Sequence, residues 1–210
     1  MCARISLYTL SEYEEAMGTE MLNDLLRSYS CPLNTEVETY LKDENRARHS
    51  SLMSSSVTYL AFDSKTSDLL GYFTLMMKSY SVLAKALSSR NRGLIRRFAE
   101  VDDKGNFAAP VYLIAQLGKN YAIPEARRIS GAELLGQALD VFRRSKKAIG
   151  GKLVMVEREI DRPKLLEFYR NNGFKSWTKR LNEKDGVIFD QMFAELNDNP
   201  QTEMTTSVRN

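Results

Sequence analysis

Two stretches in the second half of the chain decide the fold: VYLIAQL at residues 111–117 and ISGAELL at residues 129–135. The first is a continuous apolar run with β-branched and aromatic residues, which is typical of a buried strand. In the second, Ser130 is followed three residues later by Glu133, and this capping-box spacing predicts that a helix begins there. Where a strand leads through a loop into a helix, free backbone N–H groups and the helix dipole favour an anion.

Periodicity and turn residues predict the other elements in the same way. A strand–helix–strand–helix core, with a hairpin ahead of it and another behind it, predicts a mixed sheet flanked by helices. The predicted strands are 3–8, 57–62, 69–75, 111–117, 152–156, 174–180 and 187–193, and the predicted helices are 11–27, 34–49, 79–99, 131–145 and 162–171.

Composition excludes several other classes of protein. The chain has 210 residues, a net charge of +3, two cysteines and one histidine, so it cannot supply the four Cys or His ligands of a structural zinc site. His49 lies in a polar run and is predicted to be solvated rather than catalytic. No apolar run is long enough to span a membrane, and the first residues do not resemble a signal peptide. We therefore expect a cytoplasmic protein in which Cys2 and Cys31 are not joined by a disulfide.

Taken together, three motifs resemble those of the GNAT superfamily of N-acetyltransferases. The strand–loop–helix of residues 111–135 is similar to its central acetyl-CoA motif, EFYRNNGF at residues 167–174 to its "FYxxxGF" motif, and GYFTL at residues 71–75 to a common strand. The motifs occur in order over roughly residues 30–195. The resemblance implies a mixed, mostly antiparallel sheet of six or seven strands with a V-shaped splay between central strands. It also implies one acyltransferase domain over residues 1–196, a basic helical insertion at about 78–110 and a flexible tail at 197–210.

The phosphate loop departs from the superfamily pattern Q/R-x-x-G-x-G/A. Matching Gly131 to the last position of that pattern puts Ile129 on the first glycine and Ala126 on the Q/R position. Arg127 and Arg128 offer cationic contacts that compensate for the missing glycine and the missing Gln or Arg of the pattern.

The resemblance also implies roles for individual residues. The strand that ends at residues 117–119 binds the pantetheine arm and polarises the thioester carbonyl through its backbone, and Tyr169 acts as the general acid toward the sulfur of coenzyme A. Asn172 is expected either to contact the cofactor or to end its helix as an ordinary polar residue. No general base stands out, and Glu100 and Glu157 are candidates without support. The residues expected to bind acetyl-CoA are Leu117, Gly118, Lys119, Arg127, Arg128, Ile129, Ser130, Gly131, Ala132 and Asn172.

The first third of the chain resembles a subgroup that includes toxin acetyltransferases. The resemblance rests on YSCPL at residues 29–33 and TYLAF at residues 58–62. Such toxins acetylate the amino acid of a charged tRNA and are held inactive by an antitoxin protein, which implies a basic surface. Two groups could form it or could be solvated helix faces, and the sequence favours neither reading. They are Lys78, Lys85, Arg90, Arg92, Arg96 and Arg97, and then Arg143, Arg144, Lys146 and Lys147.

Three functions therefore stay open from the sequence. The first is an active acetyltransferase with a small-molecule, protein or tRNA-borne amine as acceptor. The second is a GNAT-fold module that has lost catalysis and binds a protein or an RNA, which the altered phosphate loop favours. The third is a toxin under the control of an antitoxin. A homodimer is compatible with each of them.

Overall fold

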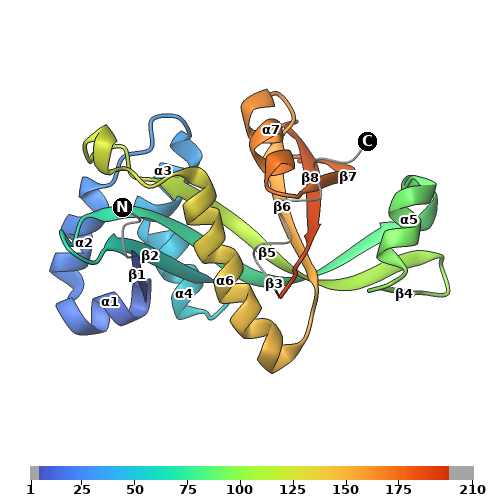
Figure 1. The fold of residues 1–210 in the computed structure, drawn as a ribbon, viewed down its shortest axis with the longest axis horizontal. Helices are drawn as coiled ribbons and strands as arrows, with labels where there is room; N and C mark the ends of the chain where they lie inside the picture. Colours follow the sequence, from blue (N-terminus) through green and yellow to red (C-terminus); the bar gives the residue numbers. More distant parts are fainter. Residues whose placement is uncertain (1–4, 199–210) are drawn as a thin grey trace. The chain divides into compact units, whose positions relative to one another are not determined.

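The computed structural model describes residues 5–198 of the chain, which divide into two compact units. Unit 1 comprises Met1–Met76 and Ile114–Ala138, and unit 2 comprises Met77–Leu113 and Leu139–Asn210. The long elements β3 (Leu69–Leu83), β5 (Asn106–Lys119) and α6 (Gly131–Ile149) each begin in one unit and end in the other (Figure 1). The expectation of one acyltransferase domain stays a prediction.

Within residues 5–198, eight strands form one sheet in the order β1-β2-β3-β5-β6-β8-β7, with β4 paired to β5 outside this order. The pairs β1–β2, β2–β3, β4–β5, β6–β8 and β7–β8 are antiparallel. The mixed, mostly antiparallel sheet flanked by helices is confirmed, with eight strands where six or seven were expected. The splay between β5 and β6 stays a prediction. The remaining strands are β1 (Ile5–Thr9), β2 (Val57–Asp63), β4 (Glu100–Val101), β6 (Leu153–Glu159), β7 (Lys175–Leu181) and β8 (Ile188–Glu195).

The N-terminal helices of unit 1 are shorter than periodicity predicts. The helix expected over 11–27 is two helices, α1 (Leu10–Met17) and α2 (Thr19–Ser28), because Gly18 between them adopts a φ of 86°, a left-handed conformation that glycine tolerates. The helix expected over 34–49 begins as α3 (Thr35–Lys42) and continues through a π-helical turn (Glu44–Arg48) into α4 (His49–Leu52). His49 is exposed, as expected.

These helices pack on the sheet of unit 1 through one apolar cluster. It includes Leu22, Tyr29, Leu41, Leu60 and Tyr72, all buried. The hydroxyl of Tyr72 donates a 2.6 Å hydrogen bond to the carbonyl of Val37, so β3 and α3 are joined by a polar contact inside an apolar region. Cys31 is a buried free thiol, and Cys2 lies outside the described residues.

Unit 2 is built around β6, β8 and β7, with the helix α7 (Pro163–Asn171) following β6. The rings of Trp177 and Tyr80 lie 4.4 Å and 4.7 Å from that of Phe193, by centroid distance. The pairing of β7 with β8 shifts register between Ser176 and Thr178. Such a bulge places one extra residue in β7 and changes the direction of the side chains beside it.

The helix predicted over residues 79–99 is wrong in most of its length. Strand β3 continues to Leu83, a 3-10 turn covers Ala84–Ala86, and the helix α5 is limited to Ser89–Ile95. The mixture of small, polar and apolar residues in this region resembles a helical period. In the structure, burial alternates along residues 76–83, as expected for a strand. The predicted basic insertion at 78–110 is therefore not one helix: it begins at the end of β3, ends at the start of β5, and has α5 and β4 in the connection between them.

Candidate active site

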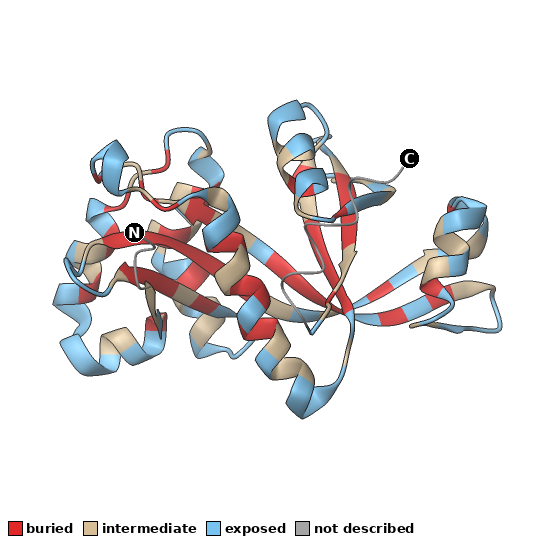
Figure 2. Ribbon diagram, viewed as in Figure 1, coloured by how far each residue is buried: buried red, intermediate tan, exposed pale blue. Residues whose placement is uncertain are grey.

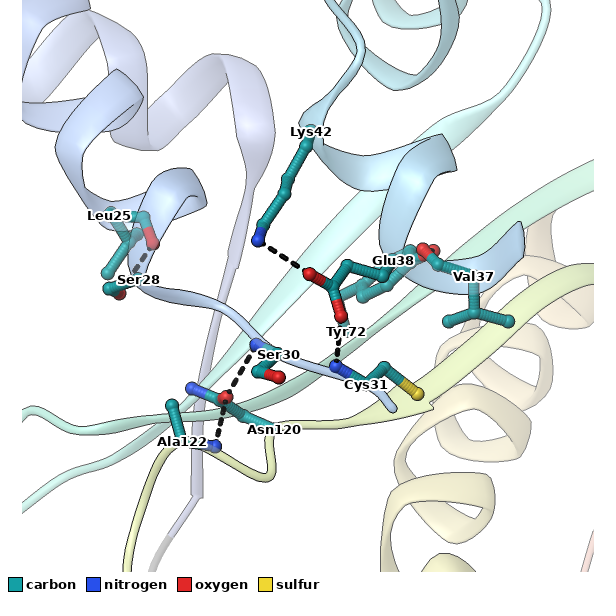
Figure 3. Close-up of polar contacts among 10 residues, drawn as sticks. All are labelled: Leu25, Ser28, Ser30, Cys31, Val37, Glu38, Lys42, Tyr72, Asn120 and Ala122. Carbon is teal, nitrogen blue, oxygen red and sulfur yellow. Dashed lines mark hydrogen bonds and ion pairs between the residues drawn. The ribbon is translucent and has the colours of Figure 1, made fainter. Parts of the chain in front are cut away.

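The loop that joins β5 to α6 is fixed at its start by Asn120, a residue that sequence analysis did not single out. The Asn120 side chain is 3% exposed. Its Oδ1 accepts hydrogen bonds from the backbone N–H groups of Ser30 and Ala122 at 3.1 and 3.0 Å (Figure 3). Its Nδ2 donates to the carbonyl of Leu69 at 2.9 Å. One amide thus ties the loop to β3 and to the segment between α2 and α3, so the loop has a defined starting point.

The two arginines of this loop have different roles. The guanidinium of Arg128 donates hydrogen bonds to the carbonyls of Ile123 and Tyr121, both at 3.0 Å, and lies 5.0 Å from the centre of the Tyr121 ring. Arg127 forms an ion pair with Asp68, and its side chain is 48% exposed. Arg128 therefore braces the loop from within, while Arg127 keeps a charged group at the surface.

The start of α6 is closed by the expected capping box. Ser130 N–H donates to Oε2 of Glu133 at 2.9 Å, and Glu133 N–H donates to Oγ of Ser130 at 3.1 Å. The carboxylate of Glu133 thus already interacts with the positive end of the helix. The N–H groups of Gly131 and Ala132 are not part of the box, so these two are the helix donors that a phosphate could reach without opening it.

The end of β5 is packed against the helical segment of unit 1. Gly118 is buried, and a Cβ built on it would lie 2.3 Å from the hydroxyl of Tyr29 and 2.4 Å from Cγ1 of Val37. A Cβ on Gly71 would lie 2.5 Å from the carbonyl oxygen of Gly118. These distances are far below van der Waals contact, so both glycines are required for the close approach of β3, β5 and the helical segment.

The other expected ligands in this part of the chain are placed as follows. Leu117 and Lys119, on either side of Gly118, are half-buried, and the Lys119 ammonium lies 5.3 Å from the centre of the Tyr121 ring. Ile129 is buried, and Ala132 is exposed. Unit 1 therefore holds the loop, the helix start and the strand end together, and a role for each in binding coenzyme A stays a prediction.

Tyr29 carries a buried polar atom at the centre of unit 1. Its side chain is fully buried, and its hydroxyl lies beside the Cys31 thiol, with no hydrogen bond of standard geometry among the described residues. Burial, with further contributions from the neighbouring Cys31 and Tyr72, raises the pKa of this phenol well above its ordinary value. Burial also raises the pKa of the Cys31 thiol, so neither group ionises at neutral pH.

In unit 2, α7 presents Tyr169. The Tyr169 ring is buried between the rings of Phe168 and Phe174, with centroid distances of 5.1 and 5.5 Å. Burial raises the pKa of Tyr169 to about 12, and no hydrogen-bond acceptor for its hydroxyl is found within the described part of the chain. The phenol is therefore protonated throughout the physiological range.

The residues after Tyr169 end its helix. Asn172 Nδ2 donates to the carbonyl of Phe168 at 2.8 Å, and the N–H of Phe174 donates to the carbonyl of Tyr169 at 3.0 Å. Gly173 between them has a φ of 86°. The "FYxxxGF" spacing thus has a structural reason, because a glycine must end the helix before Phe174 can fold back on Tyr169. The amide of Asn172 serves as a helix cap, and its contact with a cofactor stays a prediction.

Sequence analysis missed the group that holds the start of α7. The buried guanidinium of Arg158 pairs with Asp190 and also donates to the carbonyls of Glu159 and Ile160, at 2.9 and 3.2 Å. Glu159 is the last residue of β6, and Ile160 lies in the turn that leads to α7. A charged residue in an apolar strand, Arg158, is visible in the sequence. Its partner Asp190 is 32 residues away, so spacing alone could not identify the pair.

Neither carboxylate considered as a base is arranged for that role. Arg180 donates two 3.0 Å hydrogen bonds to Glu157, and Gln191 donates a third at 2.7 Å. Burial alone would raise the pKa of Glu157, but the hydrogen bonds from Arg180 and Gln191 outweigh it and lower that pKa. Glu100 is exposed on β4. Among residues 5–198, no group of His, Cys, Asp and Glu side chains could hold a metal ion.

No protein-family model matches the sequence, and no curated protein matches it. Solved structures do match the fold. The chain has the GNAT fold. One match is AtaT in complex with acetyl-methionyl-tRNAfMet, at 16% identity, with 89% of this chain and 94% of that chain covered and a TM-score of 0.58. Another is a tyrosine-to-phenylalanine mutant of KacT, at 17% identity, with 90% and 95% covered and a TM-score of 0.58.

A third match, to a tyrosine-to-phenylalanine mutant of the AtaT toxin bound to acetyl-CoA and to the C-terminus of the antitoxin AtaR, has 16% identity, 90% and 93% coverage and a TM-score of 0.52. At these identities the GNAT fold is common to all four chains. No helix within the described residues is long and apolar enough to cross a membrane.

Proposed function

We propose that this protein transfers the acetyl group of acetyl-CoA to an amine, and that the amine is the amino group of an aminoacyl-tRNA. The observation that carries the proposal is Tyr169, a phenol that α7 holds in the protonated state with a pKa of about 12. It lies on the GNAT fold, and the neighbours of that fold include a toxin solved with acetyl-CoA and a toxin solved with an acetylated tRNA.

Tyr169 acts on the leaving sulfur. The neutral amine attacks the thioester carbonyl, a C–N bond forms, the C–S bond breaks, and the thiolate of coenzyme A leaves while the nitrogen loses a proton. Tyr169 donates a hydrogen bond to this sulfur as negative charge develops on it. A thiol has a pKa of about 8.5, so complete transfer of the Tyr169 proton would be uphill. We therefore assign Tyr169 a stabilising hydrogen bond, with the proton lost by the amine completing the free thiol through solvent.

The start of α6 suits the diphosphate of coenzyme A in part. The N–H groups of Gly131 and Ala132, the helix dipole and the exposed Arg127 favour an anion. The carboxylate of Glu133 opposes it, and Arg128 is occupied in bracing its loop. We propose that Gly131, Ala132 and Arg127 bind the diphosphate, that residues 117–119 contact the pantetheine arm through their backbone, and that Ile129, Ser130 and Arg128 shape the loop.

The test is acetyl transfer to charged tRNA. Wild-type protein is incubated with acetyl-CoA labelled in the acetyl carbon and with total aminoacyl-tRNA, which is then digested to aminoacyl-adenosines for mass spectrometry. We expect label on the α-amino group of one or more amino acids and none with deacylated tRNA. If coenzyme A is released only with small amines or with lysine side chains, the protein is an acetyltransferase and the proposed tRNA acceptor is wrong.

A second candidate is a GNAT-fold module that binds a partner without catalysis. Glu133 at the helix start favours it, because a carboxylate there competes with phosphate. Calorimetric titration with acetyl-CoA separates the two: no heat at high micromolar acetyl-CoA supports the module, and saturable binding supports the enzyme.

A role as a toxin follows from the proposed acceptor, since acetylated aminoacyl-tRNA cannot extend a peptide. We propose that a small antitoxin protein controls the activity, by analogy with the AtaR complex. Induced expression of the wild type should then arrest growth, and Tyr169→Phe should relieve the arrest. Normal growth on expression of active wild type would argue against the toxin role.

A further inference from the structure

The connection between β3 and β5, residues 84–105, is a folded part of unit 2. Ser88 caps α5 by accepting a 3.2 Å hydrogen bond from the N–H of Asn91. On the inner side, Leu87, Ile95 and Phe107 are 4%, 0% and 1% exposed. Ile95 is the buried residue of α5, so the residues on the opposite side of this helix face solvent.

That outer face is basic. Lys85, Arg90, Arg96 and Arg97 are exposed and Arg92 is half-buried, and the chain has no acidic residue between Lys78 and Ala99. Figure 2 shows α5 mainly in the colours of exposed and intermediate residues. We name these five residues, Lys85, Arg90, Arg92, Arg96 and Arg97, the α5 basic face.

The α5 basic face is almost free of compensating carboxylates. Arg97 lies 3.6 Å from Glu195 in a loose, exposed ion pair, and Arg92 donates to the neutral hydroxyl of Ser89 at 3.1 Å. In the described residues, Lys85, Arg90, Arg92 and Arg96 have no ion-pair partner. Their positive charge is therefore available to an external anion.

The second basic group, at the end of α6, differs in this respect. Arg143 pairs with Asp140 at 2.6 Å and donates to the carbonyl of Asn197 at 2.9 Å, and Lys146 pairs with Asp198 at 2.7 Å. Half of this group is thus engaged inside unit 2. The sequence alone could not separate the two groups, whereas the ion pairs favour the α5 basic face.

We propose that the α5 basic face binds the phosphodiester backbone of RNA. Four of its five residues are arginines, whose planar guanidinium matches a phosphate with two hydrogen bonds. Arg92 and Arg96 are four residues apart, so they lie on one side of the helix. The proposal rests on the proposed function, in which the acceptor amine is carried by tRNA, and it assigns the contact with the polyanion to the connection between the motifs at residues 71–75 and 111–135.

The test uses deacylated tRNA, which cannot accept an acetyl group, and no acetyl-CoA. Fluorescently labelled tRNA is titrated with the wild type, with Lys85→Gln/Arg90→Gln/Arg92→Gln/Arg96→Gln, and with the matched control Arg144→Gln/Lys147→Gln/Lys175→Gln/Lys179→Gln. Both variants remove four positive charges at residues without an ion-pair partner among those described, and equal melting temperatures check that both fold. Anisotropy gives Kd at several salt concentrations.

We expect the α5 variant to bind about tenfold more weakly or worse, and its plot of log Kd against log salt to lose a slope of about 3, since each phosphate contact contributes roughly 0.7 to 0.9. The control should stay within about threefold of the wild type. Equal losses in both variants would assign the effect to net charge and overturn the proposal. Unchanged binding by the α5 variant would overturn it as well, and so would a wild type that ignores tRNA, which would favour an acidic protein partner.

Failure of the proposed function has a different signature. If the α5 variant loses tRNA binding but wild type acetylates no charged tRNA, the function fails and the RNA contact stands. If the α5 variant acetylates charged tRNA with an unchanged KM, the RNA contact fails and the function stands.

Discussion

Arg158 and Asp190 form an ion pair in the interior of unit 2, with Nη2 and Oδ2 2.9 Å apart and side chains only 4% and 7% exposed. Ser176 adds a 2.8 Å hydrogen bond to the same carboxylate oxygen. The two charges come from neighbouring strands, β6 and β8, and Arg158 reaches on to the turn before α7. The turn that leads into α7 thus depends on a buried guanidinium, and removing either member of the pair would leave the other charge buried without a partner.

The first prediction concerns this pair. Asp190→Asn should lower the free energy of unfolding by about 3 kcal/mol, because it leaves the guanidinium buried without a counter-charge. Urea unfolding measures it. The matched control is Asp24→Asn, whose partner Arg27 is 76% exposed, and it should cost less than about 0.5 kcal/mol. Equal effects at both sites would show that the buried pair does not hold the turn.

The second prediction concerns the glycines of unit 1. Gly118→Ala should destabilise the protein by about 3 kcal/mol or more, because its Cβ would overlap Tyr29 and Val37. Gly136→Ala, within α6 and with no atom within 4 Å of its built Cβ, should instead stabilise it by about 0.5–1 kcal/mol. Thermal melting distinguishes the two, and a Gly118→Ala protein as stable as wild type would contradict the close approach.

The third prediction separates the two arginines of the phosphate loop. Arg127→Ala should weaken acetyl-CoA binding by about fivefold to tenfold while leaving stability nearly unchanged, since its ion pair with Asp68 is half-exposed. Arg128→Ala should speed hydrogen exchange of backbone amides at 121–128, because that loop loses two hydrogen bonds. Calorimetry and exchange mass spectrometry measure the two effects, and unchanged affinity for Arg127→Ala would remove it from the diphosphate site.

The fourth prediction concerns alkaline pH. Burial raises the pKa of Tyr29, Tyr72, Tyr80 and Tyr169, so the folded state keeps these phenols protonated at pH values where the unfolded chain ionises them. The part of the free energy of unfolding that these phenols contribute therefore keeps its full value below about pH 10, the pKa of tyrosine in an unfolded chain, and falls as pH rises above it. For Tyr169, with a folded pKa of about 12, the loss approaches about 3 kcal/mol.

Urea unfolding at pH 8 and pH 11 tests this loss. Tyr169→Phe should reduce the difference in unfolding free energy between the two pH values, because it removes one of the ionising groups from the comparison. A wild type equally stable at both pH values would contradict the burial of these phenols.

The fold could be predicted largely from the sequence because its signals are local. The strand at 111–117 and the capping box at Ser130 predict β5 and the start of α6, and Gly173 predicts the end of α7. The expectation failed at 79–99, where β3 continues to Leu83 and the helix is limited to Ser89–Ile95.

The candidate site was predictable only in part, since its supports join distant segments. Asn120 binds residues 30 and 69, and Arg158 pairs with Asp190. Neither contact leaves a spacing that a single sequence can show. The contrast between the α5 basic face and the basic end of α6 also depends on ion pairs that form only in the folded chain.

We propose that Tyr169 assists the departure of the coenzyme A thiolate, and the kinetics of Tyr169→Phe test this role. Release of free thiol is measured with saturating charged tRNA while acetyl-CoA affinity is measured separately by calorimetry. We expect kcat to fall by about 10²-fold or more with less than a threefold change in Kd for acetyl-CoA, and no alkaline loss of wild-type kcat from Tyr169 below about pH 10. An unchanged kcat, or equal losses in kcat and affinity, would contradict the account and leave Tyr169 as a packing residue.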